Sequence, residues 1–391
     1  MKPASGPLSG ITVLEMGALV AAPYCGMLLA DMGADVIKIE PPEGDMARYF
    51  APFVHEESAF FMSVNRGKRS VQLDLKNEEH RRVAKAIAAK ADVVLHNFRS
   101  GVVERLGLSY DHVSNGNSDI IYCSISGYGP TGPMAERPGI DLLFQAESGM
   151  ISITGTNDGP GVKVGTNAAD VYAATTAAFA VASALVQREK TGRGLEIHVS
   201  LRDAFLALQA CWFSSYLATG EQPQRLGSGS PFTAPTDVYQ ARDGDIVLAV
   251  VNDKHWKILC STLGIDDLLD DERLSTNQGR VTHADDLRDR VNQALATATV
   301  DDWIARFDAA GIPAGRVLTY EGVCRDPQIR WNSMILELEH DTVGPIRVQG
   351  SPVWTDGKKQ STHEPPPVLG AHTEQVAQEF GCLEFLRGDD L

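Results

Sequence analysis

The sequence predicts an α/β protein whose N-terminal half forms a mostly parallel sheet with helices on its faces. Two observations carry this prediction: short apolar segments alternate with helical ones, and the alternation repeats along the chain. A further observation concerns the number of domains. The length of 391 residues, at roughly 100 to 200 residues per domain, predicts two or three domains. We therefore expect at least one further domain beyond the sheet.

A β-α-β unit opens the chain. Residues 11–16 form a short apolar strand, 23–32 have helical spacing of apolar residues, and 34–40 form a second strand. The pattern then recurs. We expect an Ala-rich amphipathic helix at 78–90 and further strands at 70–75, 92–96 and 119–126.

Gly and Pro crowd residues 127–139, which predicts an ordered loop or a series of turns. After this loop we expect a long Ala-rich helix at about 171–189, a strand at 196–201 and a helix at 203–219.

A linker rich in Gly, Pro, Gln and Ser is expected at 220–235. Beyond it, residues 246–251 read as a strand, several short helices reach to about 310, and a second change of composition comes at 360–367. The chain contains no internal repeat.

The composition argues against several classes of partner. With 35 Lys and Arg against 51 Asp and Glu, the net charge of −16 has the wrong sign for gripping nucleic acid or anionic lipid. The six cysteines form no C-x-x-C pair, which predicts neither a zinc site nor disulfides and fits the cytoplasm. The apolar stretch 11–30 is interrupted by Glu15, so we expect no targeting or membrane segment.

A glycine motif, G-x-G-x-x-G, occurs at Gly127-Tyr-Gly129-Pro-Thr-Gly132. Its usual meaning is a backbone cradle for a dinucleotide, but Pro130 and Pro133 remove backbone donors and no helix is expected to open after it. We therefore disfavour a nicotinamide-linked oxidoreductase. The motifs G-x-S-x-G and H-E-x-x-H are absent, and the ten histidines have no spacing typical of a metal site.

Cations gather in the segment 65–69, Asn-Arg-Gly-Lys-Arg, with Lys76 and Arg105 on flanking segments. In an acidic protein, such local positive charge is what a ligand with several phosphates requires. An ordinary solvated loop explains the same residues, and the segment alone does not decide between the two.

Asp170 stands at the expected start of the long helix. Its simplest role is an N-cap whose carboxylate accepts a backbone amide hydrogen bond. The same position also suits a carboxylate that reacts, because nearby amides could stabilise an oxyanion formed beside it. Local sequence favours the cap. The first β-α turn, residues 17–23, is equally open to a ligand site or a simple tight turn.

Taken together, several blocks of sequence resemble the class III CoA-transferases, the family that includes formyl-CoA transferase, carnitine CoA-transferase and the α-methylacyl-CoA racemases. The resemblance spans nearly the whole chain, and its marks are Pro7-Leu-Ser-Gly-Ile-Thr-Val-Leu-Glu15, Leu28-Leu-Ala-Asp-Met-Gly-Ala-Asp-Val-Ile-Lys-Ile-Glu40, residues 65–75, residues 126–133 and Gly139-Ile-Asp141.

The resemblance implies that Asp170, which follows Thr154-Gly155, is the catalytic nucleophile, and that coenzyme A enters as an acyl-CoA co-substrate with no metal. It implies CoA contacts at Ala21, Leu73, Lys76, Asn97, Phe98, Arg99, Arg105, Ile140 and Asp141. An aspartate with an ordinary pKa of ~3.9 is ionised at neutral pH and needs no general base. We therefore expect CoA transfer from a thioester donor to a small carboxylic acid through an aspartyl mixed anhydride and an aspartyl-CoA thioester.

Departures from the family pattern narrow the activity. The racemases place a histidine at the position of Ile140, and an isoleucine cannot transfer a proton, which disfavours racemisation. Val20 and Pro41 replace a glutamine and an arginine of the formyl-CoA:oxalate enzymes, whose run of glycines is also missing. An α-methylacyl-CoA racemase or isomerase and a non-catalytic CoA-binding protein remain the alternatives.

The resemblance also implies the overall organisation. Residues 1–200 with 331–391 form a large Rossmann-like CoA-binding domain, 201–224 a helical linker region, and 225–330 a smaller α+β domain. Two chains are expected to form an interlocked ring homodimer.

Overall fold

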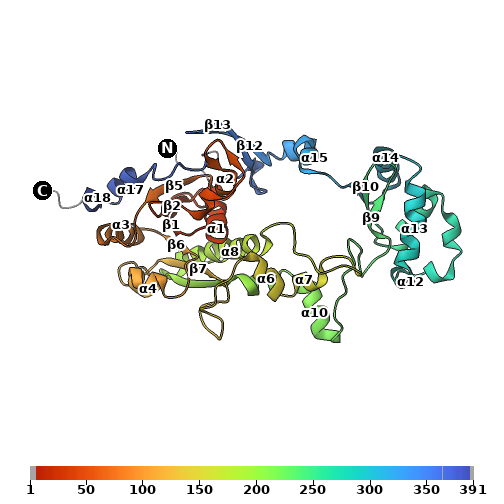
Figure 1. Ribbon diagram of the computed structural model, residues 1–391, viewed down its shortest axis with the longest axis horizontal. Helices are drawn as coiled ribbons and strands as arrows, with labels where there is room; N and C mark the ends of the chain where they lie inside the picture. Colours follow the sequence, from red (N-terminus) through yellow and green to blue (C-terminus); the bar gives the residue numbers. More distant parts are fainter. Residues whose placement is uncertain (1–5, 363, 388–391) are drawn as a thin grey trace. The chain divides into compact units, whose positions relative to one another are not determined.

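The computed structural model describes residues 6–362 and 364–387 and divides into two compact units (Figure 1). Unit 1 comprises the chain through Met150, Lys163–Glu221 and the chain from Pro327 onward. Unit 2 comprises Ile151–Val162 and Gln222–Asp326, so the chain enters it twice.

A six-stranded sheet forms the centre of unit 1. The strands are all parallel and lie in the order β5-β2-β1-β6-β7-β8. In chain order they are β1 (Thr12–Met16), β2 (Asp35–Glu40), β5 (Lys68–Gln72), β6 (Val93–His96), β7 (Ile121–Ser126) and β8 (Leu195–Ser200). The expected α/β class with a parallel sheet is confirmed. Since the order reverses between β1 and β6, a crevice for a ligand is expected at the carboxyl ends of these strands.

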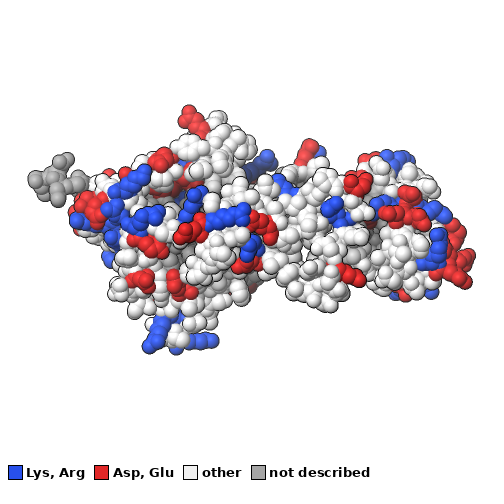
Figure 2. Space-filling view, turned by 60° about the horizontal axis from the view of Figure 1, so that its bottom comes forward, with Lys and Arg blue, Asp and Glu red and all other residues white. Residues whose placement is uncertain are grey.

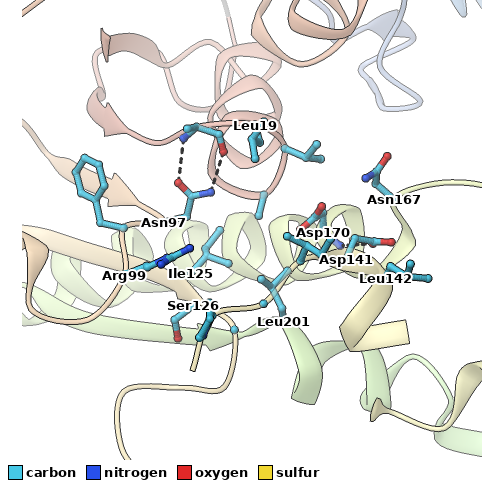
Figure 3. Close-up of a pocket in the computed structure, with 18 of the residues that line it drawn as sticks. Leu19, Asn97, Arg99, Ile125, Ser126, Asp141, Leu142, Asn167, Asp170 and Leu201 are labelled. Atoms are coloured by element: carbon cyan, nitrogen blue, oxygen red, sulfur yellow. Dashed lines mark hydrogen bonds between the residues drawn. The ribbon is translucent and has the colours of Figure 1, made fainter. Parts of the chain in front are cut away.

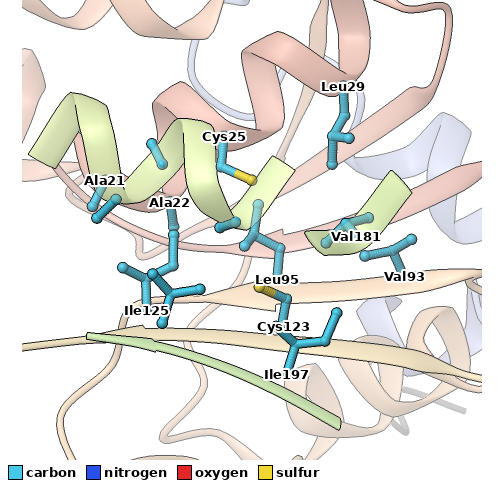
Figure 4. Packing of buried hydrophobic residues seen from close by; sticks show 14 of the residues in the cluster. Ala21, Ala22, Cys25, Leu29, Val93, Leu95, Cys123, Ile125, Val181 and Ile197 are labelled. Atoms are coloured by element: carbon cyan, nitrogen blue, oxygen red, sulfur yellow. The ribbon is translucent and has the colours of Figure 1, made fainter. Parts of the chain in front are cut away.

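Alternating side chains supply the two apolar faces of this sheet. On one face, α1 (Ala21–Asp31), α8 (Ala168–Thr191) and α9 (Leu201–Ala207) cover the strands, and Figure 4 shows α1 residues packed over side chains of β6 and β7. On the other face, α3 (Glu78–Ala88) and the C-terminal helix α17 (Thr373–Glu379) pack against the alternate residues. The remaining helices of unit 1 near this sheet are α4 (Val102–Leu106), α5 (Tyr110–Ser114), α6 (Asp141–Glu147) and α18 (Glu384–Arg387).

Helix α8 is, within the described part of the chain, the one helix long and apolar enough to cross a membrane. Its small side chains Ala173, Ala174 and Ala177 are fully buried in the sheet-facing core, and that packing accounts for the apolar composition. A core helix of this kind gives only weak evidence for a membrane span.

Three elements differ from the sequence-based expectation. Strand β5 runs over Lys68–Gln72 rather than 70–75, and α8 begins at Ala168 rather than about 171. The expected helix at 203–219 is two helices, α9 and α10 (Ala210–Thr219). Ser200 accounts for the earlier start of α9, because its hydroxyl accepts the Asp203 amide at 3.2 Å as an N-cap.

Residues near the C-terminus cover β5, which is an edge strand of the sheet. The amide of His372 donates to the Ser70 carbonyl at 3.0 Å, and the Gln72 amide donates to Thr373 Oγ1 at 3.0 Å. Before this, the hairpin of β12 (Ile335–His340) and β13 (Gly344–Gln349) packs on α2 (Ala59–Asn65). Short elements complete unit 1, namely η1 (Met46–Tyr49), β3 (Phe53–Val54), β4 (Glu57–Ser58), β14 (Trp354–Thr355), β15 (Lys358–Lys359) and α16 (Pro327–Trp331).

Unit 2 is an α+β unit with its own core. An antiparallel sheet of order β11-β10-β9 carries helices packed through Trp256, Trp303 and Phe307. Its elements are β9 (Thr236–Gln240), β10 (Asp245–Ala249), β11 (Ala314–Arg316), α11 (Asp253–Leu263), α12 (Asn277–Thr282), α13 (Ala284–Leu295), α14 (Val300–Ala310), α15 (Tyr320–Arg325), η2 (Asp266–Leu269) and η3 (Glu272–Leu274); α7 (Met150–Ile153) lies at the boundary between the units.

The surface carries charges of both signs. Figure 2 shows Lys and Arg side chains interspersed with Asp and Glu on the face in view. On α3, Arg81 pairs with Glu78 and Arg82 with Glu79.

Candidate active site

A pocket of about 810 Å³ opens in unit 1 at the carboxyl edge of the parallel sheet. Its walls are the turn after β1, the loop after β6, the end of β7, the start of α6 and the segment that leads into α8 (Figure 3). This is the crevice that the strand order creates.

Asp170 lies in this pocket as the third residue of α8, not as its N-cap. Asn167 occupies the cap position and makes no side-chain cap hydrogen bond. The capping carboxylate comes from Asp141 on α6: its Oδ1 accepts the amides of Ala169 at 2.8 Å and Asp170 at 3.2 Å. The local interpretation of Asp170 as the cap is therefore wrong, and its own carboxyl is left facing the pocket (Figure 3).

The surroundings of Asp170 raise its pKa to about 7. Burial is the larger cause, the negative charge of Asp141 adds to it, and a hydrogen bond from Asn167 opposes it. The expectation of an ordinary aspartate, fully ionised at neutral pH, is thus wrong. The contacts of Asp141 change a second expectation: the amides of Ala169 and Asp170 already donate to it, so they are not free for an oxyanion.

Most of the positions expected to contact CoA come together around this pocket. Asp170 shares its lining with Ala21, Asn97, Phe98, Arg99, Ile140 and Asp141. Three expected positions lie outside the lining. The Leu73 side chain is buried in the core between the sheet and α3, which leaves only its backbone for a ligand. Lys76 and Arg105 are exposed. The binding role of each position stays a prediction.

The cations of segment 65–69 are buried in ion pairs. Arg66 pairs with Asp31, and Lys68 Nζ lies 2.7 Å from Glu15 Oε2. Arg69 pairs with Asp35 and with Glu379, at 2.6 Å from Glu379 Oε2. Neither expectation for these cations holds, because the three side chains are buried and pair with carboxylates of β1, α1, β2 and α17. They are neither a phosphate site nor a solvated loop.

A buried lysine on β2 fixes the turn after β1 by a hydrogen bond and ion pairs. Lys38 Nζ lies 3.0 Å from Glu15 Oε1 and 2.9 Å from Asp45 Oδ2, and it donates to the Gly17 carbonyl at 2.6 Å. Asp45 Oδ1 in turn accepts the amide of Leu19 at 3.1 Å. The turn is fixed although Leu19 has a φ of 65°, a left-handed conformation that costs free energy outside glycine.

Asn97 holds the same turn from the pocket side. Its Oδ1 accepts the Ala18 amide at 3.0 Å and its Nδ2 donates to the Ala18 carbonyl at 2.9 Å, as the dashed lines in Figure 3 show. Sequence reasoning missed Lys38 and Asp45 altogether. The available signal was Lys38 itself, a charged residue between the apolar pair Val36-Ile37 and Ile39.

The glycines of the loop 127–139 make room for an aromatic ring. A Cβ at Gly139 would lie 2.2 Å from Phe144 Cζ, and one at Gly127 would lie 2.8 Å from the same atom. Tyr128 stacks edge-on against Phe144 and donates to Glu147 Oε2 at 2.8 Å. The loop therefore belongs to the packing of α6 and is not a free cradle.

A family model for CoA-transferase family III matches residues 8–373. The chain belongs to this family. Membership of CoA-transferase family III implies CoA thioesters as substrates. The chain is accordingly an enzyme, a class III CoA-transferase, and the expected resemblance is confirmed.

Relatives within CoA-transferase family III cover nearly the whole chain. A succinate–glutarate CoA-transferase of Agrobacterium fabrum is 36% identical over 97% of this chain and 96% of its own length. An acetyl-CoA:oxalate CoA-transferase of Acetobacter aceti is 36% identical over 97% of each chain. The crystal structure of a CaiB/BaiF family protein from Brucella suis superposes with a TM-score of 0.87 at 34% identity, over 96% of this chain and 99% of the other.

Proposed function

We propose that Asp170 is the nucleophile of CoA transfer. The observation that carries the proposal is the division of labour at the start of α8: Asp141 accepts the helix amides, and the Asp170 carboxyl is left facing a pocket large enough for an acyl thioester. A carboxylate that is relieved of capping and partly desolvated is a better nucleophile than one held by backbone donors.

The proposed reaction conserves charge and atoms at each step. An Asp170 oxygen attacks the donor thioester carbonyl, the C–S bond breaks, and CoA thiolate leaves a mixed anhydride on the enzyme. The thiolate then attacks the aspartyl carbonyl, the anhydride C–O bond breaks, and the donor acid departs as a carboxylate. The acceptor carboxylate reverses these two steps and leaves with CoA, which returns Asp170 to its starting state.

We extend the proposal to dicarboxylates as the acids exchanged. The two relatives described above act, by their names, on succinate, glutarate and oxalate. The cations Arg99 and Lys163 support a second carboxylate, because both line the pocket, whereas Arg137 in the same lining already pairs with Glu147 at 2.8 Å. A screen of succinyl-CoA against acids of one and two carboxyl groups, with new thioesters followed by mass, tests this part separately.

We also retain the interlocked ring homodimer, the cytoplasmic location and the division into a large CoA-binding and a small domain as parts of the proposal. Large apolar side chains support an interface: Phe179 on α8 is 74% exposed and Leu217 on α10 is 67% exposed. The cysteines of the described chain form no disulfide, which supports a reducing compartment.

Trapping identifies the nucleophile. Hydroxylamine added during turnover with succinyl-CoA is expected to convert the acylated side chain at position 170 to a hydroxamate, located by peptide mass. Asp170→Ala is expected to lose transfer by at least roughly 1000-fold with CoA binding retained. The matched control is Asp203→Ala on α9, which removes an exposed carboxylate outside the pocket. An adduct at another residue contradicts the proposal.

A further inference from the structure

Gln145 is a fully buried glutamine on α6 whose amide is bonded on both sides. Its Nε2 donates to Asp141 Oδ2 at 2.6 Å and to the Thr166 carbonyl at 3.1 Å. Its Oε1 accepts the Val164 amide at 2.8 Å. Both amide hydrogens are used: one is donated to Asp141 on the same helix, and the other to the segment that leads into α8.

Asp141 and Gln145 together bind that segment along its whole length. Gln145 holds Val164 and Thr166, and Asp141 holds the amides of Ala169 and Asp170. The 2.6 Å bond between the two side chains joins the two sets of contacts into one chain. Residues 164–170 lack strand structure up to the start of α8, so these side-chain bonds replace the backbone pairing that a strand would supply.

We propose that Gln145 is a positioning residue for the nucleophile: through Asp141 it fixes the first turn of α8 and thereby the place of the Asp170 carboxyl in the pocket. This inference rests on the proposed function of Asp170. Gln145 itself is buried and outside the pocket lining, so it acts through its neighbours.

Rotation of Asp141 is what the Nε2 bond prevents. Asp141 accepts the two helix amides through Oδ1 alone. Its carboxylate group could still rotate about the bond to Cβ if no donor held Oδ2, and the Gln145 amide is that donor. Without Gln145, Asp141 can turn away from the amides, and the first turn of α8 can shift. A misplacement of about 1 Å at a reacting group is enough to cost roughly 100-fold in rate.

Gln145→Met keeps the size of the side chain and removes the amide. We expect kcat to fall roughly 100-fold, with the Kd for CoA changed less than about threefold. The matched control is Gln209→Met. Gln209 is also buried, and its Nε2 donates to the carbonyls of Ser148 at 3.1 Å and Phe205 at 3.0 Å, but it does not touch residues 163–170. An equal loss in both variants, or a kcat within threefold of wild type for Gln145→Met, overturns the inference.

Gln145→Glu provides a second readout that a purely structural role does not move. The introduced carboxyl can still donate to Asp141 when it is protonated, whereas its ionised form sets two carboxylates against each other. The other charged groups of this region are Asp170 on α8, Glu147 on α6, which pairs with Arg137, and, in the pocket lining, Glu136, Lys163, Arg137 and Arg99.

The variant's rate is therefore expected to fall on the alkaline side, by tenfold or more, where the wild-type rate reaches its plateau. An alkaline limb absent from Gln145→Glu overturns the inference, even where Gln145→Met fails to fold. The hydroxylamine adduct on wild-type enzyme separates the two hypotheses. If no adduct forms at Asp170, the proposed function fails; if it forms and the Gln145 variants behave like wild type, only the positioning role fails.

Discussion

Asp170 and Asp141 carry the same functional group in different surroundings. Asp141 is buried and accepts two helix amides and the Gln145 amide, whereas the Asp170 carboxyl faces the pocket beside Asp141's charge. Burial and this neighbouring charge favour the neutral form of Asp170. Asp141 therefore stabilises the start of α8, whereas the carboxyl of Asp170 is available to a ligand in the pocket.

The pH dependence of turnover follows from this difference. Only the ionised Asp170 can attack a thioester, and its pKa is about 7. We expect kcat/KM to rise roughly tenfold from pH 6 to pH 8 and then level off. The measurement is the initial rate of thioester exchange over pH 5.5 to 9 at constant ionic strength. A flat profile down to pH 5 contradicts the raised pKa.

The free energy of unfolding should fall as pH rises, whereas the rate of turnover rises. The unfolded chain has an aspartate pKa near ~3.9, so between that value and about 7 the native state binds a proton that the unfolded state does not. The native state therefore loses stability as pH rises through this window. Asp170→Asn removes the effect and should stabilise the protein by roughly 1 to 3 kcal/mol at pH 8 and by little at pH 4. Thermal melting at the two pH values tests it; equal shifts at both contradict it.

At the residue scale, the sequence located the candidate nucleophile but not its environment. Asp170 looked like an N-cap because Asp is a common cap at a helix start. The capping group instead comes from Asp141, which is 29 positions away in the sequence. Likewise, nothing local to Arg66, Lys68 and Arg69 shows that distant carboxylates bury them. Such assignments require the tertiary structure.

At the scale of elements, the loop 127–139 and helix α6 act as one packed piece. Phe144 fills the space that Gly127 and Gly139 leave open, and the ring is fully buried. The sequence predicted an irregular loop from its glycines and prolines, and this is confirmed. It could not show why the glycines are needed, since the ring that excludes a Cβ lies on the next helix.

Gly139→Ala tests this packing. Its Cβ would meet Phe144 Cζ at 2.2 Å, and we expect a loss of roughly 1 to 3 kcal/mol in the free energy of unfolding. Phe144→Leu should recover part of that loss when combined with Gly139→Ala, as a double-mutant cycle measures. Gly116→Ala is the control, because its nearest contact is 3.8 Å away. Equal effects at positions 139 and 116 contradict the steric account.

The strands of the parallel sheet were predicted well because each is a short apolar run between helices. Strand β5 was the exception. Its Lys68 and Arg69 made the segment look polar, so the predicted strand began at 70. The buried carboxylate of Glu15 neutralises Lys68, and the partly exposed carboxylates of Asp35 and Glu379 pair with Arg69, which allows these charged residues to occupy strand positions.

At the scale of the whole molecule, the proposed interlocked dimer makes a kinetic prediction. Linked rings cannot exchange chains unless one of them unfolds. We expect a native mass of twice 42.2 kDa, and a mixture of isotope-labelled and unlabelled enzyme should form no mixed dimers over hours. Unfolding and refolding the mixture should then give the statistical 1:2:1 distribution, which serves as the control. Mixed dimers within minutes contradict interlocking, and a monomer contradicts the dimer.

The covering of β5 by the last residues of the chain has a consequence for biosynthesis. The edge of β5 stays unpaired while the ribosome completes residues 222–326, because the residues that cover it, Gly370, His372 and Thr373, are translated afterwards. An uncovered strand rim is a template for pairing with other chains. Polypeptides that end before residue 370 should therefore self-associate, whereas the full chain with its edge strand covered should not, and light scattering of the two compares them.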